Sequence, residues 1–185
     1  MTNRVLIFFV FILFSFNLSA QKSDNDPVLF MESEQMYGDK GEVPEGEYII
    51  PIGVADVVKQ GTDVTLVSFG KMMKIVNAAA DELTKEGINA EVIDLRSLRP
   101  IDYDTIINSV KKTNRMVFVE ESWPLGSFST ELTFKVQQNA FDYLDAPIAR
   151  VTGADVPMSF SVPLIEAYLP NVEKVVKATK QVMYR

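Results

Sequence analysis

The sequence predicts an α/β fold with three layers, in which helices cover both faces of a mostly parallel sheet and an antiparallel strand lies at one edge. From residue 64 onward, short apolar segments alternate with helical segments, and the connections between them are short. Two further strand patterns meet at Gln60-Gly61-Thr62, a hairpin turn that would supply the antiparallel edge strand. The length of 185 residues suits one such domain.

The first twenty residues differ in character from the rest of the chain. One arginine is followed by an apolar run from Val5 to Phe16 and then by the small residues Ser19 and Ala20. This is the order of a secretory signal peptide, and the apolar run is too short for a typical membrane-spanning helix. A reading frame that starts in the wrong place is the alternative interpretation, so residues 1–20 are left out of the fold prediction.

Two segments precede the regular alternation. Residues 28–33 (VLFMES) are mostly apolar and predict a strand that is buried on both faces. Residues 34–48 are rich in glycine and charge and contain a proline, which predicts a linker or an exposed crossing. Residues 53–70 then predict the two strands of the hairpin.

Apolar periodicity defines the first long helix. One helical face collects the residues at i, i+3, i+4, i+7, i+8 and i+11, namely Met72, Ile75, Val76, Ala79, Ala80 and Leu83. Lys85 lies in the last turn and Gly87 marks the C-terminal stop. A strand over residues 90–95 (AEVIDL) follows.

The next helix carries clear start signals. Asp102 is placed to cap its amino end, and Ile101 and Ile106 are spaced to form a hydrophobic staple across that cap. Lys111 and Lys112 close the last turn, where the helix dipole favours positive charge.

The rest of the chain continues the alternation. Strands are predicted within residues 115–121 and 146–153, and helices over 127–141, over 162–169 and from the cap Asn171 onward. In a parallel sheet the loops that leave the carboxyl ends of the strands share one edge. We therefore expect RSLRP (96–100), ESWPLGS (121–127) and GADVPMSF (153–160) to lie at one edge.

Composition excludes several classes of function. With 18 basic and 25 acidic residues the net charge is −7, which argues against a nucleic-acid partner and suits a basic protein partner. The sequence has no cysteine and no histidine, which excludes the usual zinc sites, disulfides and thiol- or histidine-based triads. The glycine-rich phosphate and nucleophile motifs GxGxxG, GxxxxGK[ST] and GxSxG are also absent from the sequence.

Several polar groups stand where parallel strands end. Gly70-Lys71 would suit a phosphate-binding helix start, although an ordinary turn is favoured. Glu120 and Glu121 would suit acid–base chemistry, although a role at a helix amino end or as solvated charge is favoured.

Four further residues are candidates for contacts between proteins. Arg96 and Arg99 offer a fork for a carboxylate or phosphate, but salt bridges within an interface are favoured. Trp123, the only tryptophan, suits a packed loop or an interface anchor, and the anchor is favoured. Asp145 caps a turn or, alternatively, meets a basic partner.

Several long segments together resemble the β subunit of the pyruvate dehydrogenase E1 component. They are DPVLFMESEQMYG (26–38), IPIGVADVVKQGTDVTLVSFG (50–70), EVIDLRSLRPIDYDTIINSVKKTNRMVFVEESWPLGS (91–127) and LDAPIARVTGADVPMSF (144–160). The resemblance covers Asp24 to Arg185. It implies a transketolase-type C-terminal domain over residues 49–185, preceded at 21–48 by the last strand of a pyrimidine-binding domain and a linker.

The resemblance also implies a parent reaction, the thiamine-diphosphate-dependent oxidative decarboxylation of pyruvate with acetyl transfer to the lipoyl group of E2. In the family the catalytic glutamate and histidine lie upstream, and the diphosphate and magnesium bind to the α subunit. No catalytic or cofactor-binding residue is therefore carried over, and the chain alone is expected to be inactive. The implied partners are the E1 α subunit, a second E1 β subunit and the peripheral-subunit-binding domain of E2, and the implied compartment is the cytoplasm.

Some of the family's partner sites do match residues here. Asp145 matches the aspartate of the LDAP motif, which docks the basic binding domain of E2. By resemblance, Arg96 and Arg99 are expected where the C-terminal domain meets neighbouring subunits, as interface groups and as groups that fix their loop. Trp123 is also expected at a subunit interface, from its residue type and its place in a loop.

The family's potassium site is matched only at its end. Asp24 and Asp26 stand there, whereas Gln21 and Lys22 replace the preceding ligands and argue against a working cation site.

Two interpretations of the whole chain stay open. The favoured one is a truncated or misread gene product that corresponds to the C-terminal portion of an E1 β subunit and serves subunit assembly and E2 docking. The other is an exported, non-enzymatic α/β interaction module with a signal peptide. An exported fragment would lack the α subunit and E2, which is why the first is favoured.

Overall fold

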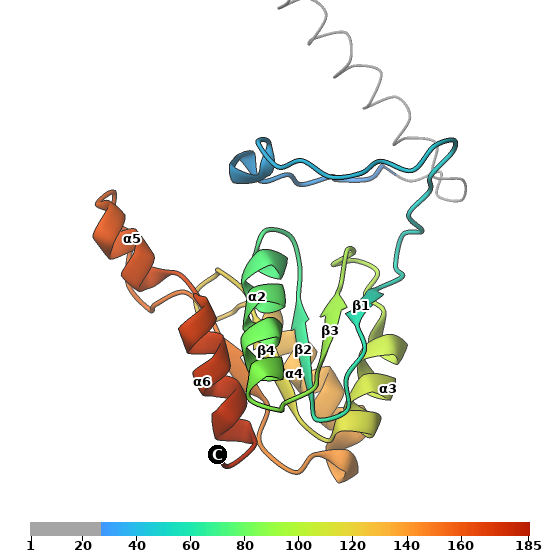
Figure 1. Ribbon diagram of the computed structural model, residues 1–185, viewed down its shortest axis with the longest axis vertical. Coiled ribbons are helices and arrows are strands. Elements are labelled where there is room, and N and C mark those ends of the chain that lie inside the picture. Colours follow the sequence, from blue (N-terminus) through green and yellow to red (C-terminus); the bar gives the residue numbers. More distant parts are fainter. Residues whose placement is uncertain (1–26) are drawn as a thin grey trace, which may run out of the picture.

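The predicted three-layer α/β fold is confirmed by the computed structural model, which describes residues 27–185 (Figure 1). The sheet consists of β1 (Asp56–Lys59), β2 (Val64–Ser68), β3 (Ala90–Asp94), β4 (Met116–Val119) and β5 (Ala149–Val151). Their order across the sheet is β1-β3-β2-β4-β5. β1 is antiparallel to β3, and the other pairs are parallel.

The predicted hairpin between β1 and β2 is wrong, although an antiparallel strand does lie at the edge. β1 pairs with β3, with Asp56 opposite Asp94 and Val57 opposite Ile93. Residues 60–63 instead cross the amino end of β3, where the N–H groups of Thr62 and Asp63 both donate to the carbonyl of Asn89. The crossing passes so close to β3 that a Cβ on Gly61 would lie 2.2 Å from the carbonyl carbon of Ala90.

Helices cover both faces of the sheet, and their ends match the predicted signals. They are α2 (Met72–Lys85), α3 (Tyr103–Thr113), α4 (Phe128–Ala140), α5 (Val162–Tyr168) and α6 (Val172–Val182), with short 3-10 turns η1 (Glu34–Met36) and η2 (Phe141–Tyr143). Asp102 caps α3 by accepting from the N–H of Thr105, and Asn171 caps α6 by accepting from the N–H of Lys174. Gly87 follows α2 with a φ of +76°.

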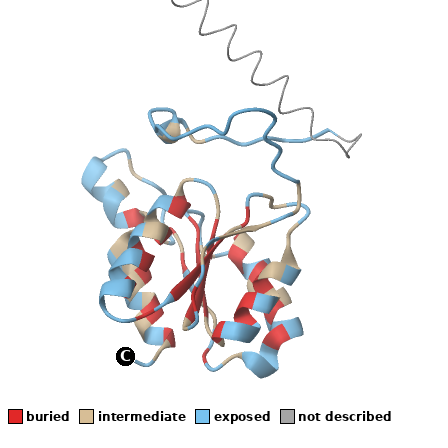
Figure 2. Ribbon diagram, turned by 45° about the vertical axis from the view of Figure 1, so that its right-hand side comes forward, coloured by how far each residue is buried: buried red, intermediate tan, exposed pale blue. Residues whose placement is uncertain are grey.

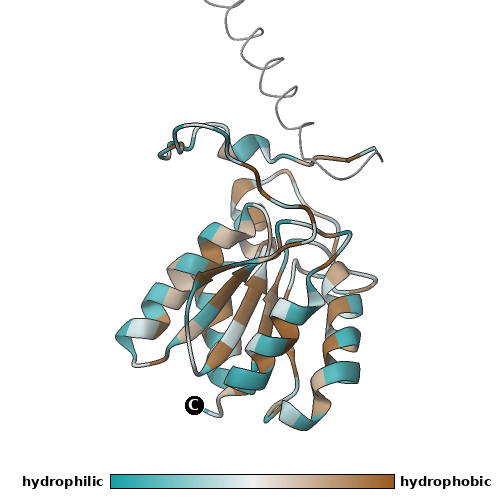
Figure 3. Ribbon diagram, turned by 90° about the vertical axis from the view of Figure 1, so that its right-hand side faces the viewer, coloured by the Kyte–Doolittle hydropathy of each residue, from teal (hydrophilic) through white to brown (hydrophobic). Residues whose placement is uncertain are grey.

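The sheet separates two apolar layers. On one side Leu66, Val92 and Val117 pack with α2 and α6, and on the other side their strand neighbours Val67, Ile93 and Phe118 pack with α3 and α4. Figure 2 shows the buried residues concentrated in the strands and on the inner helix faces. Figure 3 shows the same strands as the most hydrophobic part of the domain. Both faces are buried, as the continuous apolar runs predict.

The predicted strand at residues 28–33 is wrong. The segment forms no strand and pairs with no other part of the described chain, and Leu29 is 86% exposed. From there to Ile50 the chain is largely exposed and crosses above the carboxyl ends of the strands (Figures 1 and 2). The exposed crossing predicted for residues 34–48 is therefore confirmed.

Candidate partner-binding surfaces

The loops predicted to share one edge do so because β3, β4 and β5 are parallel. The loops that follow β4 and β5 are joined directly, since the N–H of Gly153 donates to the carbonyl of Ser122 at 3.0 Å. Gly153 is required there, because a Cβ would lie 2.7 Å from the carbonyl oxygen of Glu121.

Arg96 and Arg99 differ in their surroundings. The guanidinium Nη2 of Arg96 lies 2.6 Å from Oδ2 of Asp56, so Arg96 ties the loop after β3 to the edge strand β1. Arg96 also has a φ of +54°, which lies in the left-handed region. Arg99 is exposed. The loop-fixing role is thus present for Arg96, while an interface role for either arginine stays a prediction.

The two glutamates after β4 have separate structural roles. Glu120 is buried, and its Oε1 accepts from the N–H of Ser129 at 3.0 Å, at the amino end of α4. This confirms the helix-end role. Glu121 forms an ion pair with Lys71, with Nζ 2.5 Å from Oε2, and Lys71 also donates to Gln35. Gly70-Lys71 therefore forms an ordinary turn just before α2, and Lys71 connects this turn to the loop after β4.

Large apolar side chains are exposed at this same edge. Trp123 is 53% and Leu125 is 87% exposed, and the loop after β5 together with α5 exposes Val156, Met158, Phe160, Val162 and Leu164. We call these residues the Trp123 surface. Its loop is held by Arg150, whose Nη1 donates to the carbonyl of Pro124 at 3.0 Å and to Oγ1 of Thr130 at 2.8 Å. Apolar exposure of this extent is typical of a protein interface, which favours the anchor role of Trp123.

Asp145 lies at the opposite edge of the sheet, because it precedes β5 and so stands at the amino ends of the parallel strands. Its side chain is 55% exposed, and Oδ2 lies 3.0 Å from Nη2 of Arg115. No hydrogen bond is made to either oxygen of this carboxylate within residues 27–185, so its contact with Arg115 is an ion pair alone. The carboxylate of Asp145 is therefore paired with one cation of the chain itself and is still more than half open to solvent.

The backbone around Asp145 is fixed by three elements. The N–H of Asp145 donates to the carbonyl of Asn114 at 2.9 Å, and Nδ2 of Asn114 donates to the carbonyl of Tyr143 at 2.8 Å. The hydroxyl of Tyr184, just after α6, donates to the carbonyl of Asp145 at 3.2 Å. Tyr143 and Tyr184 are both exposed. We call Asp145, Arg115, Tyr143 and Tyr184 the Asp145 surface, in which an exposed carboxylate paired with Arg115 lies near two exposed tyrosines. The ring of Tyr143 has Nζ of Lys111 5.3 Å from its centroid.

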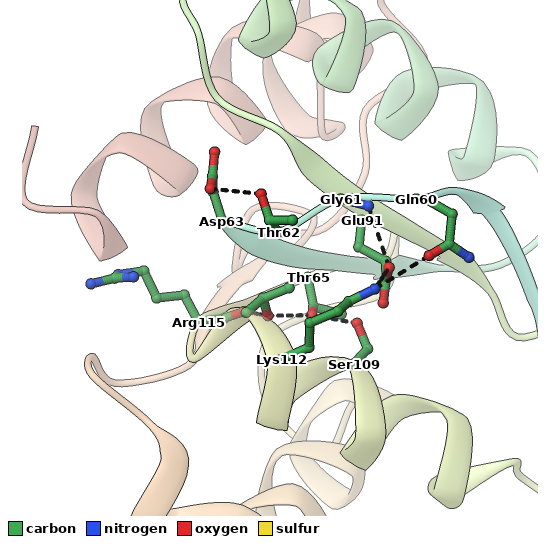
Figure 4. A network of polar contacts seen from close by, with 10 residues as sticks. Gln60, Gly61, Thr62, Asp63, Thr65, Glu91, Ser109, Lys112 and Arg115 are labelled. Atoms are coloured by element: carbon green, nitrogen blue, oxygen red, sulfur yellow. Dashed lines mark hydrogen bonds and ion pairs between the residues drawn. The ribbon is translucent and has the colours of Figure 1, made fainter.

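A buried polar network lies next to this edge and was not predicted (Figure 4). The side chain of Glu91 is 3% exposed, forms an ion pair with Lys112 and accepts from the N–H of Gly61 at 3.3 Å. The hydroxyl of Thr65 is shared with Ser109 at 2.6 Å and with Thr113 at 2.7 Å. The signal in the sequence is a charged residue between the apolar residues Ala90 and Val92 of β3. The network joins α3 to β2 and β3.

Two predictions concern residues outside the described part. Asp24 and Asp26, the potassium candidates, lie there, and so do residues 1–20. Between residues 27 and 185 no group of three acidic, histidine or cysteine side chains is placed to hold a metal ion. Over the same range, every helix is too short or too polar to cross a membrane.

The sequence and fold place the chain in a family. Residues 53–175 match the model of the transketolase C-terminal domain, and the chain belongs to this family. Its relatives include the pyruvate dehydrogenase E1 component subunit beta of Rhizobium meliloti, which is 49% identical over 91% of this chain and 37% of that protein. The mitochondrial subunit beta-2 of Oryza sativa is 45% identical over 91% of this chain and 46% of that protein. The resemblance to E1 β subunits is therefore confirmed.

Other relatives carry other names. The acetoin:2,6-dichlorophenolindophenol oxidoreductase subunit beta of Bacillus subtilis is 45% identical over 90% of this chain and 48% of that protein. A solved structure described as a split gene transketolase, inactive beta4 tetramer, matches with a TM-score of 0.63 and 31% identity over 78% of this chain and 46% of that chain. The chain thus spans about half or less of the length of these relatives.

Proposed function

We propose that the chain acts as the C-terminal portion of an E1 β-type subunit of a pyruvate dehydrogenase complex. In this role the Trp123 surface contacts neighbouring E1 subunits, and the Asp145 surface docks the peripheral-subunit-binding domain of E2. Residues 21–48 would correspond to the end of the pyrimidine-binding domain and a linker, and residues 49–185 to the C-terminal domain. Similarity to E1 β subunits over about nine-tenths of the chain supports this assignment.

One observation carries the docking assignment. Asp145 is exposed on a turn whose backbone is held from both sides, and its carboxylate forms an ion pair with Arg115 but accepts no hydrogen bond within the described chain. An exposed carboxylate on a fixed backbone suits a basic partner, and the net charge of −7 adds a favourable long-range attraction.

Catalysis by the parent enzyme would require groups from other polypeptide segments. The reaction would be the oxidative decarboxylation of pyruvate with thiamine diphosphate and magnesium. The described residues do not fit that cofactor, because no acidic cluster is placed for the metal and Lys71, at the start of α2, is paired with Glu121. The contribution of this chain would be assembly, in a cytoplasmic complex.

The docking assignment is tested by calorimetric titration of the full chain with the isolated E2 binding domain. We expect binding by the wild type, and a loss of about tenfold or more in affinity for Asp145→Asn, as for a central interface charge. Asp142→Asn removes the same charge three positions earlier in η2, and it should change the affinity by less than about twofold, as for a rim charge. Absence of binding by the wild type, or equal affinity of the two variants, would contradict the proposal.

An exported interaction module is the second candidate, and the signal-like order of residues 1–20 is the observation that favours it. Amino-terminal sequencing of the native protein separates the two candidates. A mature chain that begins at Gln21 in an exported fraction would support the module, whereas recovery with E1 α and E2 from the cytoplasm would support the E1 β-type assignment.

A further inference from the structure

We infer that Arg115, although it is itself cationic, positions Asp145 for a basic partner and so strengthens docking. The inference rests on the proposed function, since it concerns the same surface. It is not an obvious consequence of charge, because a positive group beside the docking carboxylate repels a basic partner at long range.

The backbone of Arg115 is anchored and its side chain is largely buried. Arg115 begins the chain segment that enters β4, where its carbonyl accepts from the N–H of Thr65 at 2.8 Å and from Oγ1 of Thr113 at 3.1 Å. Its Nε is buried and lacks a hydrogen-bond partner among the described residues, and its side chain is only 25% exposed. The guanidinium is thus largely withdrawn from solvent, and its Nη2 forms an ion pair with Asp145.

The contact between the two side chains is an ion pair without a hydrogen bond. Nη2 of Arg115 lies 3.0 Å from Oδ2 of Asp145, which favours the side-chain conformations that keep the carboxylate beside the guanidinium. The backbone of Asp145 is already fixed by Asn114 and Tyr184. Arg115 therefore reduces the remaining side-chain freedom, which a partner would otherwise have to restrict on binding.

Two effects of Arg115 act on different rate constants. Its charge slows the association of a basic partner, because steering depends on the long-range field. Its contact with Asp145 slows dissociation, because the short-range contacts of a preorganised charge act mainly on the lifetime of the complex. Removal of Arg115 should therefore raise both rate constants, with the larger change in dissociation.

The test measures association and dissociation of the E2 binding domain on the immobilised full chain. For Arg115→Met we expect dissociation about tenfold faster and association up to about twofold faster, so that affinity falls about fivefold. Arg115→Lys keeps the charge and should restore the dissociation rate in part. Arg185→Met removes one positive charge next to Tyr184, and it should change the association rate alone, by up to about twofold.

Each outcome has a distinct meaning. If the wild type does not bind the E2 binding domain, both the proposed function and this inference are contradicted. If the wild type binds and Asp145→Asn weakens binding, but Arg115→Met leaves dissociation unchanged or slows it, the inference alone is overturned and Arg115 competes with the partner. Circular dichroism of Arg115→Met must match the wild type, and Arg115→Lys serves as the readout if it does not.

Discussion

The carboxylate of Asp102 joins two segments that are far apart in sequence. Its Oδ2 accepts a hydrogen bond from the N–H of Ala55 at 3.0 Å, across 47 positions, and its Oδ1 accepts from the N–H of Thr105 at 3.0 Å. The amino end of α3 and the segment that enters β1 are thus held by one side chain. Burial opposes ionisation, but hydrogen bonds from Thr105 and Ala55 outweigh it and lower the pKa of Asp102 below its ordinary value.

Asp102→Asn should destabilise the fold by about 1–2 kcal/mol at neutral pH, because the amide NH2 would face the N–H of Ala55 or of Thr105. Urea unfolding measures this loss. Since folding lowers the pKa, the ionised carboxylate stabilises the native state above its ordinary pKa, and this contribution disappears as the pH falls through the folded pKa. The difference between the variant and the wild type should therefore shrink in acid. A difference that is independent of pH would contradict the role of the ionised form.

Gly61→Ala should destabilise the fold severely, by about 3 kcal/mol or more, or prevent folding, as for overpacking against backbone. The new Cβ would lie 2.2 Å from both the carbonyl carbon of Ala90 and the nitrogen of Glu91, which cannot move without disturbing β3. Gly38→Ala is the matched control, because its Cβ would meet no atom within 4 Å. Thermal unfolding of both variants checks the prediction. A Gly61→Ala protein as stable as the control would show that residues 60–63 do not pass this close to β3.

Lys112→Met should destabilise the fold by about 1–3 kcal/mol, because it leaves the buried carboxylate of Glu91 without its cation. The lower values in that range apply because the side chain of Lys112 is itself 42% exposed, so solvent weakens its attraction to Glu91. The double variant Glu91→Gln/Lys112→Met removes the buried charge as well, and we expect it to be more stable than Lys112→Met alone. Urea unfolding of the two variants gives the comparison, and the reverse order would show that the loss of stability in Lys112→Met does not come from an unpaired buried carboxylate.

Trp123→Ser combined with Leu125→Ser should reduce association of the full chain with other E1 subunits or with itself, because it removes two exposed apolar anchors. Sedimentation velocity measures the distribution of species. Phe134→Ser is the control, because Phe134 is 53% exposed, like Trp123, and lies on the exposed side of α4. Equal loss of association in both variants would indicate nonspecific apolar contact and contradict a defined interface.

Elements were predicted well from the sequence where their signals depend on residues within one helical turn of each other. The caps Asp102 and Asn171 and the apolar face of α2 depend on neighbours three or four positions away, and all are present. The strand predicted at 28–33 and the hairpin at Gln60-Gly61-Thr62 were wrong, because strand pairing is set by distant partners. The apolar run at 28–33 gives no information on whether a neighbouring strand is present to pair with it.

The candidate surfaces were likewise predictable where they depend on topology, and not where they depend on contacts between segments distant in sequence. Topology placed the loops with Trp123 at the carboxyl edge, since parallel strands dictate it. The contact of Arg115 with Asp145 depends on the close approach of the α3–β4 and η2–β5 connections, and no sequence spacing predicts it. Glu91 was likewise recognisable in the sequence only as a charged residue between the apolar residues Ala90 and Val92.

Hydrogen exchange of the full chain, with and without the E2 binding domain, tests most directly whether docking uses the Asp145 surface and leaves the Trp123 surface at the opposite edge of the sheet free. We expect added protection at residues 113–115 and 141–146 and at the C-terminal residues near Tyr184, with none at 121–127 or 153–164. Protection at the Trp123 surface instead, or no change anywhere, would contradict the account.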